Sequence, residues 1–350
     1  MKAGAIFFGT MSFCWLKLVL GLVDILIGAI LFAIMMGIAL LTASGEIGTV
    51  MFIIWLGVWG FIHWMIQHYV GYLLKAGHVA AIAQTFKDGA IPVNPVAIGK
   101  DMVKERFVTT NVYFIVDRLV AGAVKQLQKA FGKVLGLFSK LPGSGMIQIV
   151  QNVANMFIDI SLGYIDECCL GYTFYHKEQN VYKSAADGVV VYAQNWKPLL
   201  KDSAKTTFIV LLTILVVTLL SFLLIGGLFK IMGWNMIVAV IMSLILAVTV
   251  KYAFLDSWIM VKMMSSYFNA ASTTVITYDL YGKLSNMSGK FKELLRKGGE
   301  TPETATVNTF RGSTIPRQEY SAPQTRFCPQ CGTSNKNGVN FCSACGTKMN

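Results

Sequence analysis

The sequence LKLVLGLVDILIGAILFAIMMGIALLT, residues 16–42, decides the fold of this chain. Lys17 and Asp24 are its only charged residues, and a helix needs about 20 apolar residues to cross the hydrocarbon core of a bilayer. Three later stretches, 50–74, 206–229 and 234–260, are similarly long and apolar. The sequence therefore predicts four transmembrane helices. The first stretch is too long for a cleaved signal, and no small-residue cleavage site follows it.

The composition of the whole chain agrees with that class. Of 350 residues, 55% are hydrophobic and 14% are charged, and the mean hydropathy is +0.57. These values indicate an all-α integral membrane protein and argue against a soluble enzyme. The sequence contains no phosphate-binding glycine loop, no H-E-x-x-H pair and no nucleophile elbow, so we expect no enzymatic activity.

The distribution of basic residues predicts the orientation. The connection 43–49 has no Lys or Arg and the connection 230–233 has one, whereas residues 75–205 contain fifteen. Because connections rich in Lys and Arg remain in the cytoplasm, we expect a multi-pass protein of the cell membrane with both termini cytoplasmic. The formal net charge of +12 then indicates contact with the anionic inner leaflet of the bilayer, and nucleic acid is a less favoured partner.

Two amphipathic segments lie between the second and third predicted spans. In 112–138, apolar residues repeat at helical spacing, and the opposite side carries the basic residues Arg118, Lys125, Lys129 and Lys133, which we expect to face lipid headgroups. A turn at 141–145 separates it from a second helix, 146–175, whose polar stripe includes Asp159 and Asp166. We expect a helical hairpin at the cytosolic surface. The alternative, in which 112–140 and 146–175 enter the membrane, stays open.

Ionisable residues inside the predicted spans are candidate functional groups, because a charge in hydrocarbon must find a partner, face water or become neutral. Asp24 lies about two turns into the first span, with Lys17 on the same face and His63 of the second span as possible neighbours. The carboxylates Asp24, Asp159 and Asp166 could line a polar pathway. Alternatively, Asp24 and His63 make structural contacts between helices, and the stripe of 146–175 is a hydrated helix face.

The remainder of the chain is predicted to form a tail. After the first helix pair (1–74), the middle segment (75–205) and the second helix pair (206–264), residues 265–297 predict a basic amphipathic helix along the inner leaflet. Its apolar face consists of Leu280, Leu284, Met287, Phe291, Leu294 and Leu295. Residues 298–326 are rich in Thr, Pro, Ser, Gln and Glu, which predicts a flexible linker.

The last segment, 327–350, contains the strongest motif of the sequence. Its cysteines are spaced C-x2-C-x10-C-x2-C, at Cys328, Cys331, Cys342 and Cys345. Four thiolates at this spacing can surround one Zn²⁺ tetrahedrally and leave no open coordination position, so we expect a structural zinc site. Thiolates require reducing conditions, which again places the tail in the cytosol. The two knuckles, FCPQCG and FCSACG, resemble the short zinc-ribbon family found at the ends of many prokaryotic membrane and regulatory proteins.

A second resemblance involves the membrane region. VYAQNW at 191–196 and SAK at 203–205 are similar to the segment before a late span in choline transporter-like proteins, with a wider spacing here. This resemblance implies transport of a small solute. Our leading interpretation is a membrane-anchored adaptor or sensor whose zinc ribbon recruits a cytosolic protein. A transporter or channel component is the main alternative, followed by nucleic-acid or ribosome tethering; the sequence specifies no solute, partner or oligomeric state.

Overall fold

The computed structural model describes residues 2–42, 45–106, 110–135, 163–231, 236–276, 279–299, 325–327, 334–336 and 348. The chain forms two compact units, Met1–Pro302 and Glu303–Asn350. The described helices of the first unit are α1 (Ala3–Gly9), α2 (Met11–Thr42), α3 (Gly45–Met65), η1 (Ile66–Gly71), α4 (Tyr72–Asp88), α5 (Pro95–Arg106), α6 (Thr110–Leu135), α8 (Ile165–Tyr175), α9 (Val181–Gln194), α10 (Trp196–Ile231), α11 (Met236–Val250), η3 (Lys251–Leu255), α12 (Asp256–Ala271), α13 (Asp279–Met287) and α14 (Gly289–Lys297); η1 and η3 are π-helices.

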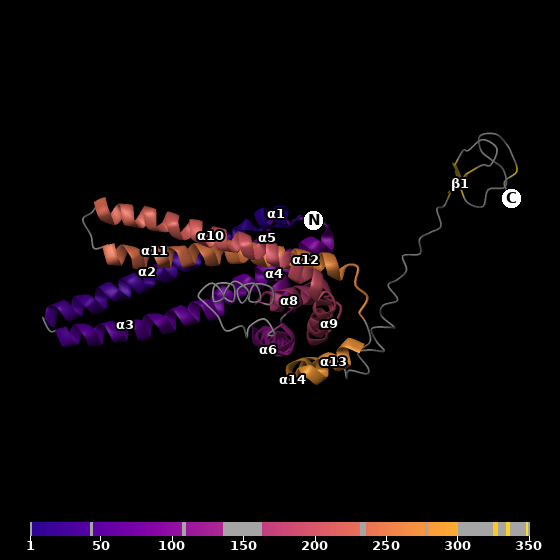
Figure 1. Cartoon of the computed structure of the whole chain (residues 1–350), viewed down its shortest axis with the longest axis horizontal. Helices are drawn as coiled ribbons and strands as arrows, with labels where there is room; N and C mark the ends of the chain where they lie inside the picture. The colour runs from indigo at the N-terminus through magenta and orange to yellow at the C-terminus, as the bar shows by residue number, and fades with distance from the viewer. Residues whose placement is uncertain are drawn as a thin grey trace. The chain divides into compact units, whose positions relative to one another are not determined.

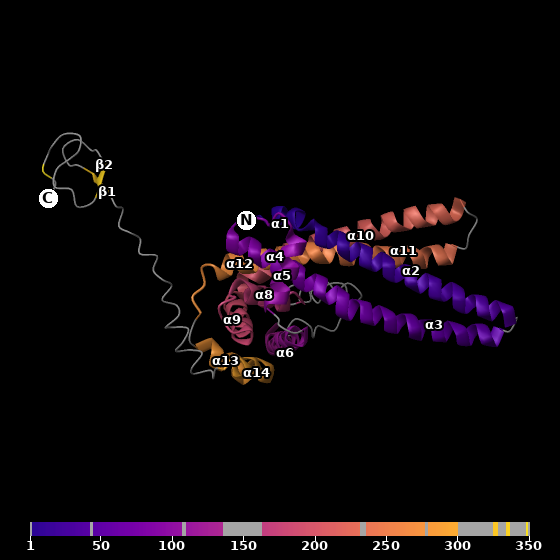
Figure 2. The ribbon, with the colours of Figure 1, turned by 180° about the vertical axis from the view of Figure 1, so that it is seen from behind.

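Four helices of the described chain are long and apolar enough to cross a membrane: Met11–Leu41, Glu46–Asp88, Ile209–Ile231 and Ala239–Ala271. This number confirms the prediction and is consistent with a multi-pass membrane protein. The pairs α2–α3 and α10–α11 extend from the same side of a helical bundle as two hairpins (Figures 1 and 2). We call the end of these hairpins away from the bundle the loop end.

The spans show where a bilayer would surround the protein. Counting about 20 residues from the loop end reaches about Val23, Trp64, Leu212 and Leu255. Large apolar side chains on the loop-end side of these positions are widely exposed, including Leu26, Ile53, Leu223 and Leu244. Exposed aromatic residues, which favour membrane interfaces, lie at or near the limit on the bundle side: Trp15, Trp64 and Tyr69. The π-helices η1 and η3 lie at this limit.

The helices continue beyond the predicted spans. We expected the second and fourth spans to end at residues 74 and 260 and the third to begin at 206, whereas α4 ends at Asp88, α12 ends at Ala271 and α10 begins at Trp196. The extension of α4 is buried in the bundle, and its small side chains, such as Ala76, Ala80 and Ala81, are fully inaccessible. Protein rather than lipid surrounds these turns, so hydropathy alone did not reveal their length.

The turn from α4 to α5 is specified locally. Gly89 terminates α4 in the left-handed region with φ = 68°, which costs glycine little. The side chain of Asn94 accepts a hydrogen bond from the Ala97 backbone N–H at 3.1 Å and caps α5. A Cβ atom at Gly99 would lie 2.2 Å from the backbone oxygen of Gly77, so the two helices are in backbone contact at this point.

The bundle contains α4, α5, α6, α8, α9, α12, α13 and α14. Helix α4 packs on α5 and α8, α8 packs on α9 and α12, and α6 packs on α8, α9 and α14. Large side chains from distant parts of the sequence fill its core: Leu170, Phe174, Tyr267, Tyr281 and Phe291. The middle segment is therefore part of one folded body with the inner ends of the spans.

Helix α6 corresponds to the first predicted amphipathic helix. Val116, Leu119, Val120 and Ala123 are buried, and Arg118 and Lys125 are exposed on the other side. The apolar face is covered by α8, α9 and α14, whereas a helix lying on the membrane would bury that face in lipid. Of the second predicted helix, Ile165–Tyr175 is described as α8; the predicted turn and residues 146–162 lie outside the described residues.

The predicted tail helix is corrected by the structure. Instead of a continuous segment, α13 and α14 are separated at Ser288, whose Oγ accepts a hydrogen bond from the Phe291 N–H at 3.1 Å and caps α14. Leu284, Phe291, Leu294 and Leu295 are buried, and α14 packs against α6 and α9. The apolar face that we expected on the inner leaflet is thus largely covered by protein; Met287 stays exposed.

The second unit contains a short antiparallel hairpin among its described residues. Strand β1 (Thr325–Phe327) pairs with β2 (Ser334–Lys336), with Thr325 opposite Lys336 and Phe327 opposite Ser334. This register makes 328–333 the connection between the strands. The predicted linker 298–326 contains the boundary between the two units, after Pro302, and lies mostly outside the described residues.

Candidate functional site

The predicted zinc ligands begin immediately after β1. In the sequence, Cys328 and Cys331 fall between β1 and β2, which pair as an antiparallel hairpin. All four predicted ligands, Cys328, Cys331, Cys342 and Cys345, lie outside the described residues. Their donor set fits a structural Zn²⁺ ion, because four thiolates satisfy tetrahedral coordination completely. Within the described ranges, no cluster of three or more His, Cys, Asp or Glu could hold a metal ion.

Asp24 and His63, which the sequence suggested as possible neighbours, are in contact. His63 Nδ1 contacts Asp24 Oδ2, and the indole N–H of Trp59 donates to the backbone oxygen of Asp24 at 3.4 Å. Asp24 is buried, whereas the side chain of His63 is 52% exposed. The contact joins α2 to α3 near the bundle-side limit that is reached by counting about 20 residues from the loop end. Lys17, the other predicted neighbour, donates instead to Ser257 Oγ of α12 at 2.8 Å.

A partly buried charge cluster lies where α4 meets α6 and α8. Lys75 Nζ of α4 is 2.5 Å from Glu167 Oε1 and 3.9 Å from Asp166 Oδ2. Asp117 of α6 is close enough to interact electrostatically with the same ammonium group. We define these four residues, Lys75, Asp117, Asp166 and Glu167, as the Lys75 cluster. Asp117 Oδ1 and Glu167 Oε2 are buried and have no hydrogen-bond partner among the described residues.

Within the Lys75 cluster, the pKa values of Asp117 and Glu167 are raised. Burial, followed by repulsion from Asp166, raises the pKa of Asp117 from 3.8 to about 6, although Lys75 opposes the shift. Burial and Asp166 likewise raise the pKa of Glu167, against the attraction of Lys75. The physical cause is the same for both residues, because three carboxyl groups share one nearby ammonium in a poorly hydrated environment. The cluster therefore favours retention of a proton.

The sequence did not identify this cluster, although it identified Asp166. Asp166 lies beside Lys75, with a side-chain exposure of 19%, rather than on an open hydrated face. Asp117 and Lys75 belong to helices 29 residues or more from α8 in the sequence, so no local pattern connects them. A usable signal was present in Asp166-Glu167, two adjacent carboxylates in a largely apolar helix. Asp159 lies outside the described residues.

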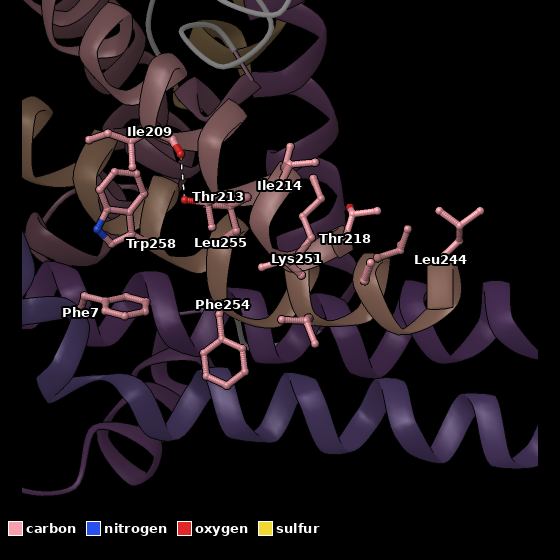
Figure 3. Close-up of a pocket in the computed structure, with 14 residues that line it drawn as sticks. Phe7, Ile209, Thr213, Ile214, Thr218, Leu244, Lys251, Phe254, Leu255 and Trp258 are labelled. Carbon is pink, nitrogen blue, oxygen red and sulfur yellow. Dashed lines mark hydrogen bonds between the residues drawn. The ribbon is translucent and has the colours of Figure 1, made fainter. Parts of the chain in front are cut away.

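An elongated groove of about 450 Å³ lies between the second pair of spans (Figure 3). Its walls come from α10, α11, η3 and α12, and Phe7 of α1 contributes at one end. The lining is mainly apolar, with Thr213, Thr218 and Lys251 as its polar members. Neither Asp24 nor Asp166 lines it. The groove therefore differs from the polar pathway that these carboxylates were expected to line.

The predicted lipid-facing basic residues are only partly described. Arg118 and Lys125 are exposed on α6, as the helical pattern predicted. Lys129 and Lys133 belong to the same helix, but their side chains lie outside the described residues. Contact of this face with lipid remains a prediction.

The comparisons with known proteins address the second unit. Residues 327–349 match a family model described as a zinc-ribbon domain. No curated protein and no solved structure matched the chain. A zinc-ribbon domain at the carboxyl end, which implies zinc binding by its cysteines, is therefore the part of this chain that a known family explains.

Proposed function

We propose that the protein is a membrane-anchored adaptor or sensor that presents its zinc ribbon to a cytosolic protein. The observation that carries this proposal is the division of the chain into a unit with four candidate spans and a separate small unit that matches a zinc-ribbon domain. A closed four-thiolate site stabilises a short segment and does not activate water. Such a module is suited to docking rather than to chemistry.

The orientation follows from two independent chemical requirements. Basic residues are concentrated in 75–205, while the connections at the loop end have few, and connections rich in Lys and Arg remain on the cytoplasmic side. The four ribbon cysteines need a reducing compartment to remain metal ligands. We infer that the bundle and the ribbon are both cytoplasmic and that the loop end faces outward.

A transport function receives less support. Transport of a polar solute would require a continuous cavity with polar walls between the spans. The described groove is mainly apolar, and Asp24 is occupied by His63 in a contact between two helices. The adaptor proposal accounts for the zinc ribbon, which a transporter does not require.

The test compares the full-length natural chain, a chain without residues 327–350, and a full-length variant that carries both Cys328→Ser and Cys331→Ser. A photo-crosslinking amino acid at Ser334, in β2, would record any protein that contacts the ribbon in cells. We expect one zinc ion per natural chain by elemental analysis and a discrete crosslinked protein. The crosslink should disappear in the double serine chain, while the amount of protein in the membrane stays unchanged.

Two outcomes would contradict the proposal. An identical set of co-purifying proteins with and without residues 327–350 would show that the ribbon recruits nothing. A crosslink sensitive to nuclease and lost steeply with added salt would point to nucleic acid, because neutralised phosphates release counterions. A second crosslinker at Ser272, an exposed residue of the first unit, serves as the matched control.

A further inference from the structure

The groove between α10 and the fourth span opens toward the hydrocarbon layer. Its rim includes Ile209, Leu244 and Val248, whose side chains are 45%, 51% and 63% exposed. These residues belong to candidate membrane spans or lie at their ends, so bilayer rather than water surrounds the rim. Its floor is formed by half-buried or buried side chains such as Val217, Ala247 and Leu255.

The groove runs along α10 and the fourth span, from their bundle end toward the middle of the spans. Ile209 and Trp258 lie near one end with Phe7, and Leu244 lies at the other (Figure 3). The nine-residue interval from Ile209 to Thr218 on α10 corresponds to about 14 Å of helix. The volume of about 450 Å³ is in the usual range for a small-molecule site, roughly 300–1,000 Å³. These dimensions suit an extended hydrocarbon chain.

Lys251 places a charged group in the groove at the depth expected for lipid headgroups. Lys251 lines it and donates to Asp256 Oδ1 and Oδ2 at 2.8 and 3.1 Å. In an α-helix, residues five apart point about 140° away from each other, but the π-helix η3 brings Lys251 and Asp256 to one side. The long side chain of Lys251 thus directs its ammonium toward the bundle end. There the hydrocarbon layer ends.

The ammonium of Lys251 retains binding capacity for an anion. An ammonium has three N–H donors, two contacts go to Asp256, and the side chain is 41% exposed. A phosphate group is the anion that a bilayer offers at this depth, and the indole of Trp258 is typical of the interface. The charge at the interface end and the apolar channel beyond it match the two parts of a lipid.

We propose that this groove is a binding site for one phospholipid of the adjacent leaflet, with an acyl chain between α10 and the fourth span and its phosphate at Lys251. The site is independent of the adaptor function proposed above. The bound lipid would fill the groove between α10 and the fourth span, next to the bundle. Its occupancy would stabilise α1, because Phe7 contributes to the same groove.

The experiment measures retention of lipid by the purified full-length chain. Native mass spectrometry in detergent, after addition of phosphatidylglycerol, should show one tightly held phospholipid per chain. Ala247→Phe fills the floor of the groove and should abolish that adduct. Leu219→Phe is the matched control, because Leu219 is 56% exposed on α10 and is not among the groove residues; it should retain the adduct.

The contribution of Lys251 is tested separately. Asp256→Asn releases the ammonium and should preserve or strengthen binding, whereas Lys251→Met with Asp256→Asn should weaken it about tenfold, the usual order for one hydrogen bond to a charged group. Diacylglycerol, which lacks the phosphate, should bind the natural chain as weakly as phosphatidylglycerol binds the double variant. Equal binding of both lipids would overturn the assignment of the phosphate to Lys251.

A further measurement uses the unmodified groove, so that its result does not depend on whether Ala247→Phe folds. Phosphatidylglycerol with brominated acyl chains should quench the fluorescence of Trp258, seen as the difference between the natural chain and Trp258→Phe. Quenching should saturate near one lipid per chain in detergent. An adduct unaffected by Ala247→Phe, no adduct on the natural chain, or quenching without saturation would each overturn the proposal.

Discussion

Asp117 is a single residue whose environment predicts a dependence of stability on pH. Its pKa is raised from 3.8 to about 6, chiefly by burial and then by Asp166. Between these values the folded chain retains a proton that the unfolded chain has released. The contribution of Asp117 to stability is therefore complete below about pH 4 and is lost as the pH rises through about 6.

The variant Asp117→Asn should remove this dependence, because an amide does not titrate. The free energy of unfolding of the variant, relative to that of the natural chain, should increase from pH 4 to pH 7 and then level off. The total increase should be no more than about 3 kcal/mol. Thermal unfolding in detergent across this range measures it. Asp101→Asn, an exposed carboxylate on α5, is the control. A difference between the Asp117 variant and the natural chain that stays constant with pH would contradict the prediction.

Residue contacts could be predicted where they lie inside an apolar span. Asp24 needed a partner in hydrocarbon, and among few polar candidates His63 was the correct one. Lys17 was also predicted, but it reaches Ser257, whose position depends on how the fourth span crosses the first. The pair of Lys75 and Glu167 required knowledge of the bundle, which no periodicity supplies.

At the level of elements, the spans were predictable and their ends were not. Apolar runs revealed four helices because lipid demands uninterrupted hydrophobicity over about 20 residues. Beyond the bilayer, the same helices continue as α4 and α12 among protein neighbours, where small and polar residues are equally acceptable. Amphipathic patterns were ambiguous for a related reason, because the same pattern suits a helix on a membrane surface and a helix packed on protein. The helices α6 and α14 bury their apolar faces in the bundle.

Helix α14 offers a test of that distinction. Leu294 is fully buried where α14 packs against α6 and α9, so Leu294→Ala should cost about 2–5 kcal/mol of local packing. Hydrogen–deuterium exchange in detergent should rise in α13, α14 and the facing part of α6. Lys292→Ala, an exposed residue of the same helix, should change little.

The comparison with lipid nanodiscs completes the test of α14. Packing against protein predicts the same protection from exchange in detergent and in nanodiscs. If protection of the natural α14 appeared only in nanodiscs and Leu294→Ala had no effect in detergent, the helix would be held by the membrane surface, as its sequence pattern first indicated.

At the scale of the whole molecule, the bundle helices and the spans belong to one compact body, Met1–Pro302. Two long helices that continue into the bundle, α3–η1–α4 and α11–η3–α12, each contain a π-helix near the limit reached by counting about 20 residues from the loop end. Tyr252 of η3 lies near Gly71 of η1, with its hydroxyl 3.2 Å from the position of a Cβ on Gly71. A π-turn changes the side-chain register of the helix that follows it. The π-helices η1 and η3 thus determine which sides of α4 and α12 face the rest of the bundle.

The orientation of this body is the prediction on which the adaptor proposal depends. Glu46 lies at the loop end and Ser272 follows α12, and both side chains are exposed. With the loop end outside, a membrane-impermeant maleimide should label Glu46→Cys in intact cells and Ser272→Cys only after permeabilisation. The natural chain gives the background, because Cys14, Cys168 and Cys169 are buried and the four ribbon cysteines, as expected zinc ligands, are present in every variant. Labelling of Ser272→Cys in intact cells would place the basic bundle outside, where thiolates are not kept reduced, and would remove the basis for a cytosolic partner.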